Sequence, residues 1–240
     1  MLKVHAEALD FVDRSQHYTA LQPLIDDFSQ MVAGQGFGTF VMTGLPVVGT
    51  DFDQLVICNH WPTDWTDRYV EQNYFPDDPV SKWSLTKDRP FQWAEARRAN
   101  ERTGRVEQID GEAREFGMAD GIAFPMRTSR GWQAVMSLAS ERAVDVSKRD
   151  EGMLLMASIY FQMAATDLMS TEKKTVSITP REREILQWTA VGKTAWETSQ
   201  ILNISEKTVR NHLNAIHLKF NVSSTTQAVV EALRTRQLHI

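Results

Sequence analysis

The sequence predicts an α+β protein in two parts, with helices and strands mixed in residues 1–169 and an all-helical module of four helices in residues 178–240. In the first part, apolar residues recur at helical spacing in some segments, and strand-like segments lie between turn residues. In the second part, helix-start signals follow one another closely. The polar segment 170–177 indicates a linker between them. A chain of 240 residues is long enough for two modest domains.

Periodicity and turn residues predict the first elements. A helix is expected over residues 17–33, because the apolar residues there share one face and Gly34 and Gly36 can end it. Strands are expected over residues 37–43 and 54–59. The loop between these strands is marked by Pro46, Gly49 and Asp51.

The later elements of the first part follow the same rules. A helix is expected over residues 106–116, then strands over 121–127 and 132–139 with a turn at 128–131. A long amphipathic helix comes next, and its first turn resembles a capping box in which Asp150 replaces the usual Glu or Gln.

Composition limits the class of protein. The net charge is −5, but residues 178–240 carry eight Lys and Arg against five Asp and Glu, or +3, and the rest of the chain carries −8. The basic end could therefore face phosphates while the acidic body stays away from them. The single cysteine, Cys58, excludes an internal disulfide and a multi-cysteine zinc site. Without a membrane-length apolar run or a signal peptide, we expect a soluble cytoplasmic protein with no cofactor, metal or membrane.

Helix caps organise the C-terminal module. Thr179 and Glu182 form a capping box around a proline suited to the first helical position, and Gly192 can end that helix in a left-handed conformation. Thr194 and Glu197 form a second capping box that begins a short helix. A short turn and a third helix follow. These signals predict a helix-turn-helix arrangement.

The third helix has two chemically different faces. Its apolar stripe consists of Val209, Leu213, Ile216 and Phe220. Its opposite face carries Lys207, Asn211 and Asn214, with Arg210 on the flank. Such a helix suits the major groove of DNA, where arginine binds guanine edges and asparagine binds adenine. Thr194, Lys207 and Thr208 are placed for phosphates near helix N-termini. A helical bundle with a solvated polar face is the structural alternative.

The C-terminal segments resemble the LuxR family of regulators. The matching segments are Thr179–Trp188, Gly192–Thr194 and Ile201–His212. Glu182, Leu186 and Gly192 match residues characteristic of the DNA-binding domain of that family. This resemblance covers about a quarter of the chain and implies sequence-specific binding to double-stranded DNA.

The N-terminal part resembles the autoinducer-binding domain of the quorum-sensing members. The matching residues are His60–Tyr69, Tyr74, Asp78–Val80, Phe91–Trp93, Gly121, Pro125 and Ser137. The resemblance implies an α/β/α sandwich around an antiparallel sheet, with an N-acyl-homoserine lactone between sheet and helices. It also implies a homodimer on an inverted-repeat promoter site, and RNA polymerase is a further candidate partner.

The resemblance assigns roles around the lactone. Trp65 would donate its N–H to the lactone carbonyl, and Asp78 would accept the ligand amide N–H. Tyr69 and Ser137 would serve the acyl carbonyl region, and Trp93 would wall the lactone end. Such a site is mostly apolar with a few fixed polar groups.

One residue departs from the family pattern. Trp61 occupies a position at which several members have a tyrosine that bonds the acyl carbonyl. An indole is larger and can donate but not accept. We therefore expect a reshaped pocket that favours a short, branched or aryl acyl group.

Other interpretations stay open at this point. Trp65 and Tyr69, four residues apart, share a helix face and could be ordinary core residues. Asp78, before a proline, could simply begin a turn, and Ser137 could be an ordinary strand residue. A ligand-independent regulator whose N-terminal domain mainly dimerises is the alternative function. An enzyme is disfavoured, since neither a His-Glu-x-x-His motif nor a Gly-x-Ser-x-Gly elbow occurs.

Overall fold

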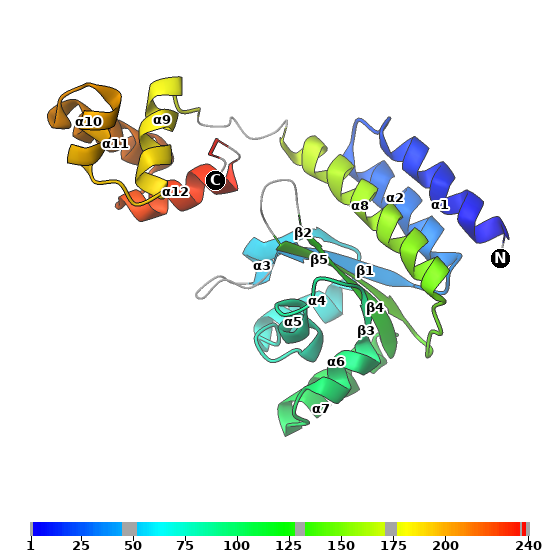
Figure 1. Ribbon diagram of the computed structural model, residues 1–240. Coiled ribbons are helices and arrows are strands. Elements are labelled where there is room, and N and C mark those ends of the chain that lie inside the picture. Colours follow the sequence, from blue (N-terminus) through cyan, green and yellow to red (C-terminus); the bar gives the residue numbers. More distant parts are fainter. Residues whose placement is uncertain (1, 45–51, 128–132, 171–176, 236, 239–240) are drawn as a thin grey trace. The chain divides into compact units, whose positions relative to one another are not determined.

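The computed structural model describes every residue except 1, 45–51, 128–132, 171–176, 236 and 239–240 (Figure 1). The described residues form two compact units, one up to residue 170 and the other from residue 177. The predicted turn at 128–131, the loop residues Pro46, Gly49 and Asp51, and most of the predicted linker lie outside the described residues.

The first unit is built on a five-stranded antiparallel sheet with the order β2-β1-β5-β4-β3. The strands are β1 (Thr39–Gly44), β2 (Val56–Asn59), β3 (Phe91–Gln92), β4 (Asp120–Arg127) and β5 (Gln133–Ser140). Strands β4 and β5 are consecutive in the sequence and pair along their whole length. Strand β1 also pairs with β5, although most of the sequence of the unit separates these two strands.

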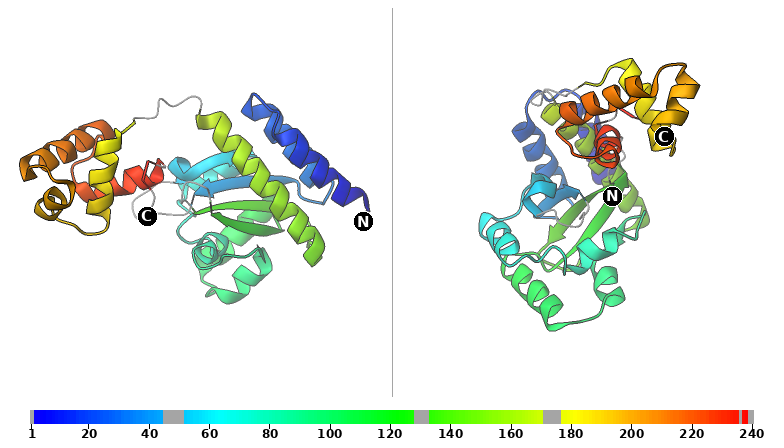
Figure 2. Two further views of the ribbon diagram at one scale, coloured as in Figure 1. Left: turned by 45° about the horizontal axis from the view of Figure 1, so that its top comes forward. Right: turned by 90° about the vertical axis from the view of Figure 1, so that its left-hand side faces the viewer.

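Helices cover both faces of this sheet (Figure 1). The helices on one face are α1 (Leu2–Ser15), α2 (Leu21–Ala33) and α8 (Lys148–Ser170). The helices on the other are α4 (Thr63–Glu71), α5 (Pro79–Ser84), α6 (Trp93–Ala99) and α7 (Gly104–Glu115), with the short α3 (Phe52–Leu55) nearby. The left-hand view of Figure 2 shows α1 and α8 side by side. The predicted α/β/α sandwich is confirmed.

Strand alternation sends side chains into two separate cores. Phe40 and Met42 of β1 pack under α1, α2 and α8, while Val41 between them faces the other layer. Phe28 of α2 anchors the first core, with ring centroids 4.9 Å from Phe40 and 4.5 Å from Phe161. Such offset and edge-to-face aromatic contacts add to the burial of apolar area. Val41 of the second core also lines the cavity described below.

Some sequence predictions of this unit were wrong in detail. Helix α2 begins at Leu21 and not at residue 17, because Pro23 fits the first turn of a helix but would clash with a carbonyl in its interior. The strand expected over residues 54–59 begins at Val56, after a turn of helix. Helix α1 was not predicted; it packs through Phe11, whose ring centroid lies 5.4 Å from that of Phe28.

The described residues of the second unit form four helices around a small core. They are α9 (Pro180–Ala190), α10 (Ala195–Leu202), α11 (Glu206–Phe220) and α12 (Thr225–Arg234). Both predicted capping boxes are present, and Gly192 has the predicted positive φ of 87°. Asn203 turns the chain between α10 and α11 with φ 51° and ψ 50°, a left-handed conformation that asparagine tolerates. The predicted helix-turn-helix arrangement is therefore confirmed.

Candidate functional site

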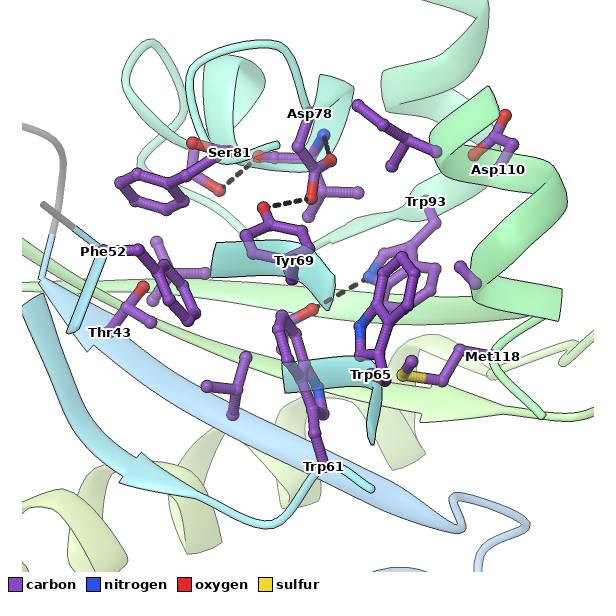
Figure 3. A pocket seen from close by; sticks show the side chains of 18 of the residues that line it. Thr43, Phe52, Trp61, Trp65, Tyr69, Asp78, Ser81, Trp93, Asp110 and Met118 are labelled. Atoms are coloured by element: carbon purple, nitrogen blue, oxygen red, sulfur yellow. Dashed lines mark hydrogen bonds between the residues drawn. The ribbon is translucent and has the colours of Figure 1, made fainter. Parts of the chain in front are cut away.

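A cavity lies in the first unit, between the sheet and helices α4 to α7 (Figure 3). The space between its walls, counted together with the open solvent at its mouth, is about 680 Å³. Six predicted ligand contacts line it: Trp61, Trp65, Tyr69, Asp78, Trp93 and Ser137. They come from α4, α6 and β5, from the loop before α4 and from the residue that caps α5, so the fold brings together residues that are distant in sequence.

Helix α4 supplies the aromatic wall. It starts directly after Pro62, and the spacing of four places Trp65 and Tyr69 on one face, each 2% exposed. Their ring centroids are 5.6 Å apart. Both side chains also belong to the second core, so the structural role considered from sequence coexists with their place in the cavity wall.

Tyr69 and Asp78 form a buried hydrogen-bonded pair. The Tyr69 hydroxyl donates to Asp78 Oδ2 over 2.9 Å, and the Val80 N–H donates to Asp78 Oδ1 over 2.7 Å. Asp78 therefore caps α5, with Pro79 at the first helical position. Asp78 therefore does begin a turn, as the sequence allowed, and its carboxylate also faces the cavity.

Burial changes the ionisation of this pair. Burial raises the pKa of Asp78, while the N–H of Val80 and the Tyr69 hydroxyl oppose the change; the net pKa lies above its ordinary value. Burial, together with the neighbouring Asp78 carboxylate, raises the pKa of Tyr69 well above its ordinary value. Tyr69 is therefore a neutral donor, and Asp78 can accept a further hydrogen bond from a ligand.

Trp93 and Ser137 form a second pair that joins α6 to β5. The Trp93 indole N–H donates to Ser137 Oγ over 3.0 Å, and both residues are buried. Because Ser137 Oγ accepts this bond, its own hydroxyl proton is free to point into the cavity. The indole of Trp93 lies directly against Gly121 of β4, where a Cβ atom would come 2.6 Å from Trp93 Cε2 and closer still to the Leu138 carbonyl oxygen.

Gly121 is expected to be essential for this wall. Gly121→Ala should lower the free energy of unfolding by about 3 kcal/mol or more, because neither the β5 backbone nor the packed indole can retreat freely. Urea unfolding monitored by tryptophan fluorescence measures this loss. Gly152→Ala in α8 is the control, since nothing lies within 4 Å of its added methyl group. An unchanged unfolding midpoint for Gly121→Ala would contradict the close packing of Trp93.

Several cavity residues were not predicted from sequence. At the Trp93 end, the Arg97 guanidinium pairs with Asp110 over 2.9 Å and lies 5.7 Å from the Trp93 ring. Elsewhere Phe52 stacks on Trp61 with ring centroids 5.8 Å apart and planes 11° apart. No local spacing signals these contacts, because α6 meets α7, and Phe52 of α3 meets Trp61, only in the folded unit.

The cavity has the chemistry of a binding site. It offers aromatic surfaces, a carboxylate acceptor and hydroxyl donors. Cys58, outside the cavity, is buried, and burial raises its pKa to about 12, so it is not a thiolate nucleophile. Within the described part of the chain, no group of three His, Cys, Asp or Glu side chains could hold a metal ion.

The second unit exposes the predicted polar face of α11. Val209 and Ile216 are fully buried in the small core. The exposed side chains on the other side are Lys207, Arg210, Asn211 and Asn214. A helix with one apolar and one donor-rich face is the form used in major-groove recognition.

Three of the predicted contacts have partners inside the unit. The Arg210 guanidinium bonds Glu206 one turn earlier, over 2.5 and 3.0 Å. The Thr194 hydroxyl belongs to the capping box of α10, and that of Thr208 bonds Ser205 over 2.8 Å. To contact a base, Arg210 must therefore either break its ion pair with Glu206 or bind the base while keeping that ion pair. This ion pair was not predicted from the sequence.

An ion pair between the buried Glu182 and the partly exposed Lys219 joins α9 to α11. Glu182 of α9 is 4% exposed and accepts from Lys219 Nζ over 2.7 Å and from the Thr179 N–H over 2.6 Å. Burial raises the pKa of Glu182, but these two donors outweigh it and leave the pKa below its ordinary value. The ionised Glu182 thus ties α9 to the C-terminal end of α11.

Comparison with protein families identifies the chain that combines this cavity with a helix-turn-helix unit. The family described as "Autoinducer binding domain" matches residues 22–165, and "Bacterial regulatory proteins, luxR family" matches residues 176–232. The chain belongs to the LuxR family. An autoinducer-binding domain implies a small-molecule ligand, and the regulatory domain implies DNA as a partner. The family prediction from sequence is confirmed.

Similar proteins agree with this membership. The quorum sensing-dependent transcriptional regulator RpaR of Rhodopseudomonas palustris is 37% identical, over 94% of this chain and 92% of its own. The transcriptional activator BjaR1 of Bradyrhizobium diazoefficiens is 32% identical, over 95% and 94%. Among solved structures, SdiA of Escherichia coli matches 95% of this chain and 96% of its own, at 21% identity and a TM-score of 0.76. This last likeness shows the shared fold.

Membership in the LuxR family settles the class of activity. Its similar members are transcriptional regulators with a DNA-binding domain and not enzymes. The predicted regulator is therefore confirmed, and the enzyme interpretation is set aside. Among the described helices, none is long and apolar enough to cross a membrane.

Proposed function

We propose that this LuxR-family protein binds an N-acyl-homoserine lactone in the cavity of its first unit and that binding controls its attachment to a specific DNA site. The supporting observation is the convergence of Tyr69, Asp78, Trp93 and Ser137 on one cavity as two preformed hydrogen-bonded pairs. Preformed polar groups in an aromatic cavity are suited to a neutral ligand with both amide and carbonyl groups.

Each polar group of the lactone has a complementary side chain. Asp78 accepts the ligand amide N–H with its remaining acceptor capacity, and Trp65 donates to the lactone carbonyl. Tyr69 already donates its proton to Asp78, so the Ser137 hydroxyl is the better donor for the acyl carbonyl, with Tyr69 beside it. Trp93 walls the lactone ring.

Trp61 shapes the acyl region. Its indole Nε1 is buried and has no hydrogen-bond partner among the residues that the structure describes. Its ring stacks on Phe52 and lies 5.1 Å from that of Tyr69. The bulk of these rings favours a short, branched or aryl acyl group over a long straight chain.

The second unit carries the output. In this proposal α11 lies in the major groove, where Arg210 binds a guanine edge and Asn211 and Asn214 bind adenine. Thr194, Lys207 and Thr208 contact phosphates, the last helped by the free N–H groups at the start of α11. The domains are residues 1–169 for ligand and dimerisation and 178–240 for DNA, joined by a linker at 170–177.

The proposed assembly is a homodimer. A homodimer in the bacterial cytoplasm would present two copies of α11 to an inverted-repeat promoter site. RNA polymerase is the further partner that transcription control would engage.

Titration of the purified, ligand-free protein with a panel of lactones tests the proposal. A lactone that binds only the folded protein stabilises it by about 2.7 kcal/mol at one hundred times its Kd. We expect the largest stabilisation from short, branched or aryl lactones, together with tighter binding to promoter DNA. A clear preference for long straight chains would overturn the acyl assignment. Equal DNA binding with and without every lactone would indicate a ligand-independent regulator.

A further inference from the structure

The two ends of the cavity differ in chemistry. In Figure 3, Trp93, Met118 and Asp110 lie on one side of Tyr69, and Thr43, Phe52 and Ser81 lie on the other. The first side is the proposed lactone end. The second side is therefore where the far end of an acyl group would lie, and it contains two hydroxyl side chains that no proposed contact uses.

The Ser81 hydroxyl is buried without a partner. Ser81 is 9% exposed, and its Oγ makes no hydrogen bond to any residue that the structure describes. Ser84, one turn later on α5, instead donates to the Val80 carbonyl over 2.7 Å. A buried hydroxyl that forgoes a hydrogen bond is unfavourable for the folded chain. Because Ser81 lines the cavity, a bound ligand can supply the missing partner.

The surroundings of Ser81 define the partner. Thr43 of β1, 6% exposed, lines the same end of the cavity. The walls there are aromatic, with ring centroids of Phe52 and Phe75 5.2 Å apart. Among the described residues that line the cavity, Arg97 is the only cation, and it pairs with Asp110 at the opposite end. An anionic group would be uncompensated beside Ser81, whereas a neutral hydroxyl fits.

We propose that Ser81, with Thr43 beside it, forms a polar subsite for the far end of the acyl group, so that the ligand is a homoserine lactone whose short or aryl acyl group ends in a hydroxyl. This inference rests on the proposed function. The Ser81 hydroxyl can both donate and accept, which matches the same dual capacity of a ligand hydroxyl. The subsite selects the group at the end of the acyl chain. Asp78 and Trp65 bind the amide and the lactone carbonyl, which all N-acyl-homoserine lactones share.

A matched pair of lactones tests the subsite. The probes are 3-phenylpropanoyl-homoserine lactone and 3-(4-hydroxyphenyl)propanoyl-homoserine lactone, which differ by one hydroxyl. Full-length protein should bind the hydroxylated lactone roughly tenfold more tightly, as one buried hydrogen bond allows. Ser81→Ala should reduce this preference to about onefold. Ser84→Ala, whose hydroxyl is already bonded within α5, should keep it.

Two further measurements keep the test decisive. Thr43→Val, which preserves side-chain shape, should also weaken the preference for the hydroxylated lactone. Without ligand, Ser81→Ala should melt no lower than the natural protein, because it removes an unpaired polar group, and Ser84→Ala should melt lower.

The outcomes separate this subsite from the proposed function. Equal affinity for the two lactones, or a preference that survives in both Ser81→Ala and Thr43→Val, overturns the subsite and leaves the lactone function standing. Binding of neither lactone, nor of any other homoserine lactone, overturns the proposed function and the subsite with it.

Discussion

Replacement of Asp78 by alanine is expected to lower the affinity for a homoserine lactone by about 2 kcal/mol, or roughly thirtyfold, because the ligand amide loses a charged acceptor. Isothermal titration of full-length protein measures the loss. Alanine also removes the cap of α5, where Asp78 accepts from the Val80 N–H. A second variant is therefore needed to separate ligand binding from folding.

Asp78→Asn is that variant. Asparagine caps helices as well as aspartate and keeps the side-chain shape, but its amide donates where the carboxylate accepts. We expect Asp78→Asn to melt close to the natural protein and to lose lactone affinity nearly as much as Asp78→Ala. Lactone binding that survives in Asp78→Asn would show that the amide N–H of the ligand goes elsewhere.

Replacement of Arg210 by alanine is expected to weaken binding to the specific DNA site roughly tenfold to 100-fold, because a bidentate arginine contact to guanine is lost. The loss should be confined to sites that contain the contacted base, which gel-shift titrations of single-base variants can show. Lys207→Ala, at a proposed phosphate contact, should instead weaken binding to all sequences about equally.

Glu206 provides a matched control for Arg210. Glu206→Gln frees the guanidinium from its ion pair and removes a negative charge near the phosphates. We therefore expect Glu206→Gln to bind DNA at least as tightly as the natural protein. Weaker binding would mean that Glu206 positions Arg210 for its base.

The effect of Arg210→Ala should be confined to DNA binding. Arg210→Ala should leave lactone affinity unchanged, since Arg210 and the cavity belong to different units. Because lactone binding is proposed to control DNA binding, Asp78→Asn should also lose the lactone-dependent part of its DNA affinity. A folded Arg210→Ala that lost lactone affinity would require revision of the assignment of one task to each unit.

The sequence predicts features that depend on local chemistry. The capping boxes at Thr179 and Thr194 and the left-handed Gly192 occur as expected, because each involves groups within one helical turn. The same holds for Trp65 and Tyr69, whose spacing alone places them on one face of α4.

The sequence does not predict contacts that form only when distant elements meet. Arg97 meets Asp110 across α6 and α7, and Lys219 reaches Glu182 from α11 to α9. The short helices α3, α5 and α6 lack a periodic signal, since fewer than three turns give little periodicity. Ser81 stands out only after folding, when its hydroxyl is buried without a partner among the described residues.

The central claim is that a homoserine lactone occupies the cavity and controls DNA binding. Mass spectrometry of small molecules extracted from protein purified from its native host tests it most directly. We predict about one equivalent per chain of an N-acyl-homoserine lactone, and lower affinity for promoter DNA after its removal. Protein that binds its promoter fully while containing no extractable lactone would contradict the claim.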